Sequence, residues 1–140
     1  MYLNGKLRLN DENMHRFGSF LARNAEIFER HFGERLFNGS LNVLVPSPSS
    51  LPDDLDAKRP PPSIVIPKDD MRDNTCGDGQ AWRCTLTTPK IPRPVPCWIF
   101  RRIGSTVDRG IIELLSAEEL VNPNDLWDGD EVTITVEDLQ

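Results

Sequence analysis

The sequence has few of the residues that enzymes use for nucleophilic or zinc chemistry. Its 140 residues include two histidines, His15 and His31, and three cysteines, Cys76, Cys84 and Cys97. The cysteines form no CxxC pair, have no histidine at a zinc-ligand spacing, and are odd in number, which excludes a complete disulfide framework. We therefore expect buried or incidental thiols, and neither a zinc site nor a cysteine nucleophile.

The chain also lacks a long apolar run and an excess of positive charge. No stretch approaches the roughly 20 apolar residues that span a bilayer, and the first residues, MYLNGKLRLNDEN, lack the apolar segment of a signal peptide. With 22 acidic and 16 basic residues, the formal net charge of −6 disfavours nonspecific binding to nucleic acid. We expect a cytoplasmic protein with neither a membrane nor a nucleic acid as its partner.

Proline is abundant but unevenly placed. Most of the 12 prolines lie within residues 46–67 and 89–96, which predicts ordered or semi-rigid loops in these two tracts. The rest of the chain is patterned for folding, and its length suits one ordinary domain with a hydrophobic core of its own. We therefore treat residues 1–140 as a single domain.

Apolar periodicity predicts several short strands and one long helix. The helix begins at a cap near Ser19 and ends at Gly33, after a polar turn over 9–17. Ser116 and Glu119 form a capping-box pattern, which predicts a short helix ending before the next proline. The predicted strands are 2–9, 41–45, 63–67, 81–87, 96–103, 110–115 and 132–136. Many short strands without a βαβ rhythm are typical of a small, mainly β barrel.

Two side chains with oxygen atoms stand at the start of a predicted strand, in the stretch NGSLNVLV at 38–45. Ser40 and Asn42 are two residues apart, so in an extended chain both point to the same side. They either present two neutral oxygens to one ligand or ion, or hydrogen-bond the backbone of their own turn. Taken alone, the stretch favours the turn.

The order of these signals resembles the CTP-dependent riboflavin kinase family, which has a six-stranded cradle-loop barrel fold. GSLN at 39–42 follows the helix and resembles the family's P-G-T-L-N element, IIELL at 111–115 partly resembles its E-I-I-A-P segment, and DGDEV at 128–132 matches its closing hairpin. The resemblance implies a riboflavin kinase-like barrel with one long and one short helix. It also implies transfer of the terminal phosphoryl of CTP to the 5′-hydroxyl of riboflavin, giving FMN and CDP.

The resemblance further implies a magnesium site. In the family the Thr and Asn of the element hold Mg²⁺, a role that carries over to Ser40 and Asn42, and neutral oxygens suit a hard cation that also binds phosphate. Glu113, flanked by apolar residues, is the candidate to accept the proton of the riboflavin hydroxyl; alternatively it faces solvent. We also expect phosphate or nucleotide contacts from Lys6, Arg8, Gly39, Arg101 and Arg102, and flavin contacts from Phe37, Ser105 and Thr106.

Two elements of the family pattern are missing. Its glycine-rich phosphate loop is replaced by LNDENM at 9–14, where Asp11 and Glu12 would repel a triphosphate. The stretch RRIGSTVDRG at 101–110 lacks the family's histidine. One alternative is therefore a noncatalytic flavin- or nucleotide-binding barrel that has lost the phosphate loop. Another is a DNA-binding swapped-hairpin barrel, which the acidic balance disfavours. The sequence leaves the oligomeric state open.

Overall fold

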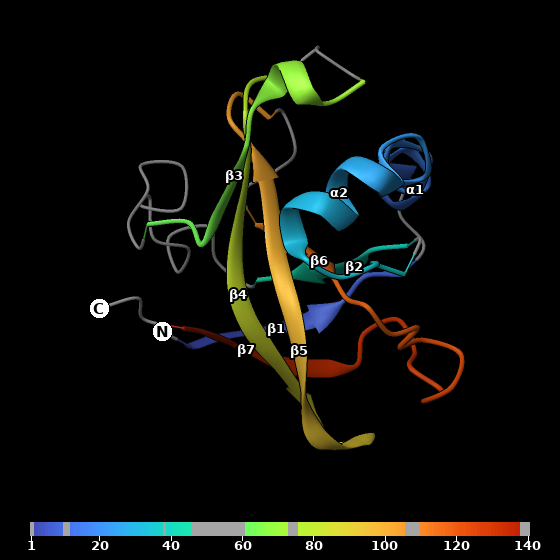
Figure 1. Ribbon diagram of the computed structural model, residues 1–140. Helices are drawn as coiled ribbons and strands as arrows, with labels where there is room; N and C mark the ends of the chain where they lie inside the picture. The colour runs from blue at the N-terminus through green and yellow to red at the C-terminus, as the bar shows by residue number, and fades with distance from the viewer. Residues whose placement is uncertain are drawn as a thin grey trace.

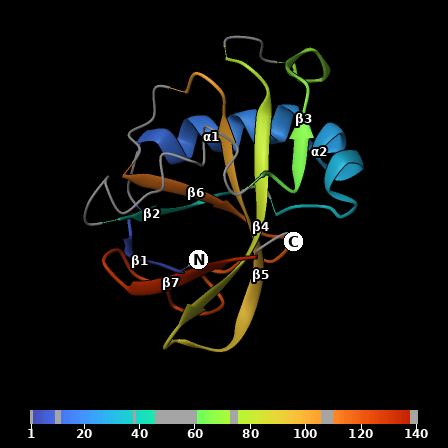
Figure 2. The ribbon, with the colours of Figure 1, turned by 90° about the vertical axis from the view of Figure 1, so that its left-hand side faces the viewer.

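The computed structural model describes residues 2–9, 12–37, 39–45, 61–72, 76–105 and 110–137, with the backbone alone for 12–17. Within these residues the strands form one antiparallel sheet in the order β3-β4-β5-β6-β2-β1-β7, and pairing of β4 with β7 closes six of them into a barrel (Figures 1 and 2). The strands are β1 Tyr2–Leu7, β2 Leu41–Leu44, β3 Ile64–Ile66, β4 Gly79–Thr88, β5 Ile91–Arg102, β6 Ile111–Leu115 and β7 Glu131–Val136. The predicted mainly β, six-stranded barrel is confirmed, and β3 is an extra strand on the edge of β4.

Strand alternation divides the buried side chains into two cores. On β4, Trp82, Cys84 and Leu86 point into the barrel, where they pack with Cys97 of β5 and with the inward residues of the other barrel strands. The opposite face of β5 and β6 packs against the helices and forms a second core. Both barrel cysteines are buried as expected, and burial raises the pKa of the Cys97 thiol to about 12, so the thiol stays protonated at neutral pH.

The helical segment is longer than predicted and is broken in the middle. Helix α1 covers Glu12–Arg23 and α2 covers Ala25–Phe32, so the predicted polar turn over 9–17 is wrong from residue 12 onward. The break falls at Asn24, whose buried side chain donates to the Phe20 carbonyl (2.9 Å) and accepts from the Arg72 backbone N–H (2.8 Å). Side-chain hydrogen bonds of this kind compete with helix continuation. In the described part of the chain, neither helix is long and apolar enough to cross a membrane.

The two helices lie beside the upper half of β4 and β5, above β2 and β6 (Figure 1). Their aromatic side chains bury one face of the sheet: the Phe28 ring is 5.3 Å from that of Phe100, and the Phe32 ring is 4.9 Å from that of Trp98. Helix α2 ends at Gly33 as predicted, with φ of 74° at that residue, a left-handed conformation that glycine adopts without steric cost. A short 3₁₀ helix, η3, covers Lys68–Asp70.

The predicted short helix after β6 is absent from the described residues. Ser116 Oγ instead accepts the Glu118 backbone N–H, two residues on, at 3.1 Å. In a capping box the Ser116 hydroxyl would accept the backbone N–H three residues further on, but here the local turn already uses it. The segment is also too close to Pro123 for a helix to develop. The segment runs as turns to Leu126 and covers one mouth of the barrel, because Leu120 and Leu126 are buried in its core.

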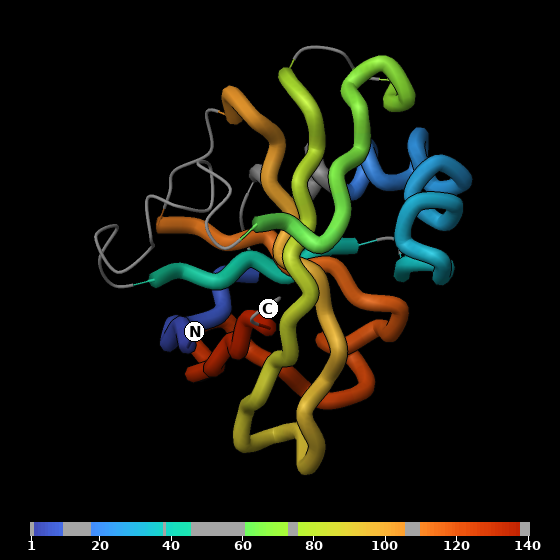
Figure 3. The backbone as a smooth tube through the Cα atoms, turned by 60° about the vertical axis from the view of Figure 1, so that its left-hand side comes forward, coloured from blue at the N-terminus to red at the C-terminus, as the bar shows by residue number. Residues whose placement is uncertain are grey.

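The proline tract at 89–96 was predicted as a loop, but strand β5 begins at Ile91. Pro92, Pro94 and Pro96 occupy alternate positions, so their nitrogen atoms face the same edge of the strand. Proline has no N–H to donate, so this edge is not the one that hydrogen-bonds to β4. On the other side, β6 pairs with β5 only from Trp98, beyond the prolines. The prolines therefore cost no ladder hydrogen bond, and β4 and β5 form the long hairpin seen in Figure 3.

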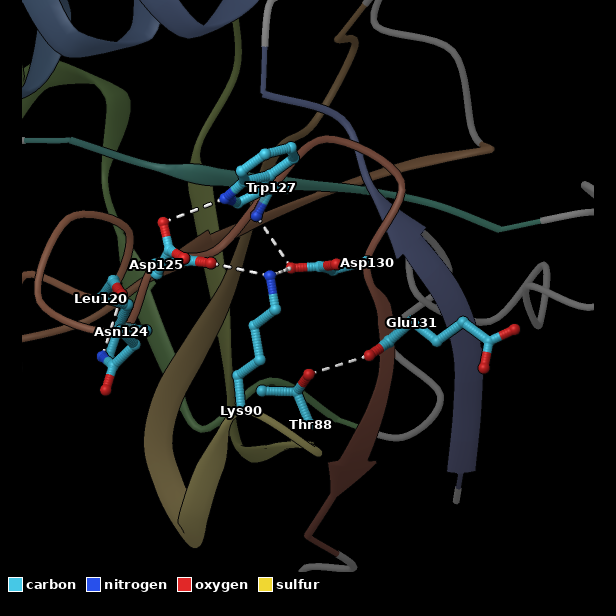
Figure 4. A network of polar contacts seen from close by, with 8 residues as sticks. All are labelled: Thr88, Lys90, Leu120, Asn124, Asp125, Trp127, Asp130 and Glu131. Atoms are coloured by element: carbon cyan, nitrogen blue, oxygen red, sulfur yellow. Dashed lines mark hydrogen bonds and ion pairs between the residues drawn. The ribbon is translucent and has the colours of Figure 1, made fainter.

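A polar network fixes the turn that precedes β7 (Figure 4). Asp130 accepts a hydrogen bond from the Trp127 backbone N–H at 2.8 Å and forms an ion pair with Lys90 at 2.9 Å. Lys90 also donates to the Asp125 carbonyl at 2.7 Å, and the Trp127 indole N–H donates to the Asp125 carboxylate at 2.9 Å. The β4–β5 hairpin is thereby tied to the segment that closes the barrel.

Gly5 is expected to be indispensable to the packing of β1 on β2. A Cβ there would lie 2.7 Å from the Leu44 carbonyl oxygen and 2.7 Å from a Val43 methyl group, so β1 and β2 approach closely at this residue. We expect Gly5→Ala to lower the free energy of unfolding by about 1–3 kcal/mol in denaturant titrations. The control is Gly18→Ala in α1, where a Cβ meets nothing within 4 Å; it should be neutral or stabilising. Equal effects of the two changes would contradict the steric explanation.

We expect the free energy of unfolding to fall at acidic pH, because Asp130 then becomes protonated. The hydrogen bond from the Trp127 N–H and, next, the Lys90 ammonium lower the pKa of Asp130 below its ordinary 3.8. The contribution of ionised Asp130 to the free energy of unfolding is therefore present above pH 3.8, and it is lost as the pH falls through the lower pKa of the folded state. We expect Asp130→Asn to lower the thermal midpoint at pH 7 and to match the unaltered protein well below pH 3.8. Asp69→Asn on η3 is the control, and a pH-independent effect of Asp130→Asn would refute this electrostatic role.

Candidate functional site

The site begins with a row of residues on the outer face of the barrel. Leu41 and Val43 of β2 point into the barrel core, so Ser40 and Asn42, which alternate with them, point outward. Asn42 stands directly opposite Glu113 of β6, and cross-strand partners project from the same face. On the other edge, the Arg8 backbone N–H donates to the Asn42 carbonyl at 2.9 Å. Strand pairing thus places Arg8, Asn42 and Glu113 side by side.

The two side chains singled out in the sequence are buried without hydrogen-bond partners. Ser40 is 7% exposed and Asn42 is 0% exposed. Within the described part of the chain, neither Ser40 Oγ nor either polar atom of the Asn42 carboxamide has a hydrogen-bond partner. The alternative in which both side chains bond the backbone of their own turn is therefore wrong. Each unsatisfied buried group costs about 1–3 kcal/mol, so these atoms are arranged for something other than stability.

The orphaned atoms fit a hard cation. Ser40 Oγ and Asn42 Oδ1 are neutral oxygen donors of the kind that bind Mg²⁺, which keeps several ligands from water or phosphate. The described residues contain no cluster of three or more His, Cys, Asp or Glu that could hold a metal ion without such ligands. The donor set therefore suits a cation delivered together with phosphate oxygens.

A cavity of about 580 Å³ opens beside Ser40. Three segments wall it: one side of α1, the approach to β2, and the turns that follow β6. Its floor is the mouth of the barrel, and Asn42 and Glu113 lie behind Ser40, outside the lining. The described lining residues are Leu9, Gly18, Ser19, Ala22, Phe37, Gly39, Ser40, Leu41, Cys97, Leu114, Ser116, Glu118, Glu119, Leu120, Val121 and Asn122.

Comparison with known families decides the affiliation of the chain. The CTP-dependent riboflavin kinase family model, described as a domain of unknown function, DUF120, matches residues 18–136. The chain belongs to the CTP-dependent riboflavin kinase family. The match spans the helices, the row of Ser40, Asn42 and Glu113, and the whole cavity apart from Leu9. No curated protein matches the chain.

The structure brings only some of the predicted site residues to the cavity. Phe37 lies at its rim with 41% of the residue exposed. Gly39 lies under that ring, because a Cβ at Gly39 would be 3.1 Å from it. Lys6 lies on β1, and Arg8, the first residue after β1, continues the same outer face because its N–H still bonds to β2. Lys6 and Arg8 are therefore next to the row of Asn42 and Glu113 rather than in the cavity.

The cationic residues at the end of β5 lie elsewhere and do not line the cavity. The Arg102 guanidinium donates to the carbonyls of Gly77 and Cys76, both at 3.1 Å, and lies over the Phe20 ring at 5.5 Å. Its contacts bind the end of β5 to α1 and to the segment before β4. Arg101 and Ser105 belong to this same end of the strand, and Thr106 lies outside the described residues.

Sequence patterns did not reveal that the segment after β6 forms part of the cavity wall. Ser116 and Glu119 were marked only as a helix-capping pattern, yet both line the cavity. The Ser116 carbonyl accepts the Phe37 backbone N–H at 2.8 Å, which joins the approach to β2 to the turns after β6. No sequence periodicity reports such a contact between residues 79 positions apart. The one available signal was the run of polar side chains in SAEE at 116–119, directly after a predicted strand.

Two buried asparagines should respond in opposite ways to replacement by leucine. The Asn42 carboxamide is unpartnered, so Asn42→Leu should raise the free energy of unfolding by about 1–3 kcal/mol in magnesium-free denaturant titrations. Asn24 is equally buried but hydrogen-bonded to Phe20 and Arg72, so Asn24→Leu should lower it by a similar amount. If Asn42→Leu proves as destabilising as Asn24→Leu, the Asn42 carboxamide has a structural role instead.

Proposed function

We propose that this chain transfers the terminal phosphoryl group of CTP to the 5′-hydroxyl of riboflavin, giving FMN and CDP. The observation that carries the proposal is the set of buried, unpartnered oxygens of Ser40 and Asn42 beside a cavity of about 580 Å³. Membership of the riboflavin kinase family supports the choice of substrates. Phosphoryl transfer relies mainly on positioning and on neutralising charge, and this row of residues offers both.

The donor phosphates are assigned to the outer-face row. Ser40 Oγ and Asn42 Oδ1 would hold Mg²⁺, which would supply charge neutralisation to the transferring phosphoryl group. The exposed Lys6 and Arg8 side chains belong to the same face and supply positive charge for the remaining phosphate oxygens. The Gly39 backbone N–H donates to the Phe37 carbonyl at 2.9 Å, so Gly39 would contribute close approach of its Cα to a ligand rather than a hydrogen bond.

Glu113 is proposed to take the proton of the attacking hydroxyl. The 5′-oxygen of riboflavin attacks the terminal phosphorus, the bond from that phosphorus to the bridging oxygen breaks, and CDP leaves with the electron pair. The hydroxyl proton goes to a Glu113 carboxylate oxygen. Because Glu113 lies one residue pair behind the cavity lining, the flexible ribityl chain is the part of riboflavin that reaches it. The flavin ring then stays near Phe37 at the rim.

A noncatalytic flavin- or nucleotide-binding barrel is the second candidate, and one observation favours it. The family match begins at residue 18, after the stretch LNDENM at 9–14 that replaces the glycine-rich loop. Without that loop, the backbone N–H groups that surround phosphates in the family have no counterpart in the sequence. In this case riboflavin binds to the cavity, and no phosphoryl transfer follows.

Turnover assays with the four nucleoside triphosphates separate the two candidates. Purified protein is incubated with riboflavin, magnesium and each triphosphate in turn, and FMN is followed by chromatography. We expect FMN with CTP. We also expect Glu113→Gln and Asn42→Ala each to reduce the rate by about 10²-fold or more, as loss of a proton acceptor or a metal ligand does.

The matched control is Glu26→Gln, which makes the same chemical change on the exposed surface of α2 and should leave the rate unchanged. Formation of FMN at the normal rate by Glu113→Gln would remove Glu113 from the mechanism. Absence of FMN with every donor, while riboflavin still binds, would replace the kinase with the noncatalytic barrel.

A further inference from the structure

The hydrogen bonding between β1 and β7 continues past the end of the paired strands. The last regular pair joins Lys6 of β1 to Glu131 of β7. At the next position along β1, the Leu7 N–H donates to the Asp130 carbonyl at 2.8 Å, and the Leu7 carbonyl accepts the Gly129 N–H at 2.7 Å. The turn before β7, drawn in Figure 4, therefore holds the end of β1.

A side chain supplies the next contact along this edge of β1. The backbone of the turn leaves β1 here, because the Asp130 N–H donates to the Trp127 carbonyl at 3.1 Å and closes a four-residue turn. The Asp128 carboxylate then accepts the Leu9 backbone N–H at 2.8 Å. An ionised acceptor makes such a hydrogen bond stronger than one between neutral groups. Asp128 thus extends the hydrogen bonding of β1 to a residue that the β7 backbone does not reach.

This contact acts on two residues of the proposed site. On the opposite edge, the Arg8 N–H donates to the Asn42 carbonyl at 2.9 Å, so Arg8 and Leu9 are held from alternate sides. Arg8 is exposed on the outer face, whereas Leu9 packs on the barrel core and lines the cavity. Leu9 is also the first residue of LNDENM, the stretch that replaces the glycine-rich loop. Asp128 therefore fixes the point at which β1 passes into that stretch.

We propose that Asp128 is a positioning residue for the nucleotide: by holding Leu9, it keeps the Arg8 side chain within reach of phosphate oxygens bound beside Asn42. This inference rests on the proposed function for the identity of the nucleotide. Without Asp128, the end of β1 would be held at its β2 edge alone, and strand ends with few contacts fray. Ordering the backbone of Arg8 before the nucleotide arrives removes part of the entropic cost of binding.

The direction of the effect distinguishes positioning from simple charge repulsion. Asp128 is itself negative, so if only its charge mattered, its removal would tighten the binding of a triphosphate. Loss of its contact with Leu9 should instead weaken binding. Asp128→Asn and Asp128→Ala remove the same charge from an exposed position, but only asparagine retains an oxygen that can accept the Leu9 N–H. The two variants are therefore matched controls for each other.

Calorimetric titration with CTP and magnesium, without riboflavin, measures the effect on binding. We expect Asp128→Ala to raise the dissociation constant by roughly two- to fivefold, the size of one exposed charge contact. Asp128→Asn should leave the dissociation constant unchanged or lower it. Thermal melts show whether each variant is folded at the temperature of the titration.

Double variants test whether Asp128 acts through Arg8. In an Arg8→Ala background, Asp128→Ala should have no further effect on CTP binding, because the side chain that it positions is gone. In a Lys6→Ala background it should keep its full effect. Lys6 is paired on both edges, with Leu44 and with Glu131, and does not depend on Asp128.

Hydrogen exchange of the Leu9 amide, followed by NMR, tests the contact itself without nucleotide. Exchange should be faster in Asp128→Ala than in the unaltered protein, and it should remain slow in Asp128→Asn. The inference is overturned if the Leu9 amide exchanges alike in the two variants, or if both variants bind CTP equally. It is also overturned if Asp128→Ala weakens binding as much without the Arg8 side chain as with it.

Two further outcomes separate this inference from the proposed function. Absence of CTP binding by the unaltered protein would refute the phosphate role of Arg8 together with the proposed function. The expected pattern of CTP binding without formation of FMN in the turnover assay would refute the kinase activity alone. The positioning role of Asp128 would then stand for a nucleotide-binding barrel.

Discussion

The alternation of β2 between two environments is the constraint on which the site depends. Leu41 and Val43 are held in the barrel core, and Leu114 of β6 is held there beside them. That apolar packing fixes the register in which Asn42 faces Glu113, because a slip of one residue would exchange the two faces of the strand. The polar groups are therefore positioned by hydrophobic contacts on the opposite side of the sheet. They need no hydrogen bonds to one another, and among the described residues the Ser40 hydroxyl and the Asn42 carboxamide make none.

Asn24 and Asn42 show that a buried polar side chain does not always have hydrogen-bond partners. Asn24 and Asn42 are both fully buried. The Asn24 carboxamide joins α1 to the segment before β4 and has a partner for both of its ends, as buried polar groups in native proteins do. The Asn42 carboxamide has a partner for neither among the described residues. An unpartnered buried carboxamide lowers stability, which is consistent with the role as a ligand-binding group that the proposed function gives to Asn42.

The sequence predicted the features that local patterns determine. Apolar alternation predicted the barrel strands, and Gly33 predicted the end of the helix. Both features depend on residues that are close in sequence. The helix break at Asn24 was missed because its cause, the Arg72 N–H, lies 48 residues away. The predicted strand began at residue 96, whereas β5 begins at Ile91. Proline content alone does not show which edge of a strand is unpaired, and prolines are tolerated at such an edge.

The candidate site was predictable only in part for the same reason. Ser40, Asn42 and Glu113 were found through motif resemblance, and strand pairing then placed Asn42 opposite Glu113. The cavity escaped detection because its walls come from segments that meet only in the folded chain. Nor does any sequence pattern distinguish Asn42 from Asn24. Whether a buried amide has partners depends on neighbours that the fold supplies.

The lost glycine-rich loop changes how a phosphate group would be held. A loop of backbone N–H groups surrounds phosphate oxygens with fixed dipoles, whereas Lys6 and Arg8 supply charges on long, exposed side chains that salt screens readily. In the proposed function, such charges would attract a nucleotide but would position it poorly. Precise placement then falls to Ser40 and Asn42, which are held by the β2 backbone and buried on the helix side of the sheet. In the proposed site the rigid part is therefore β2 with the residue before it, because their backbone holds the Asn42 and Ser40 side chains next to these cations.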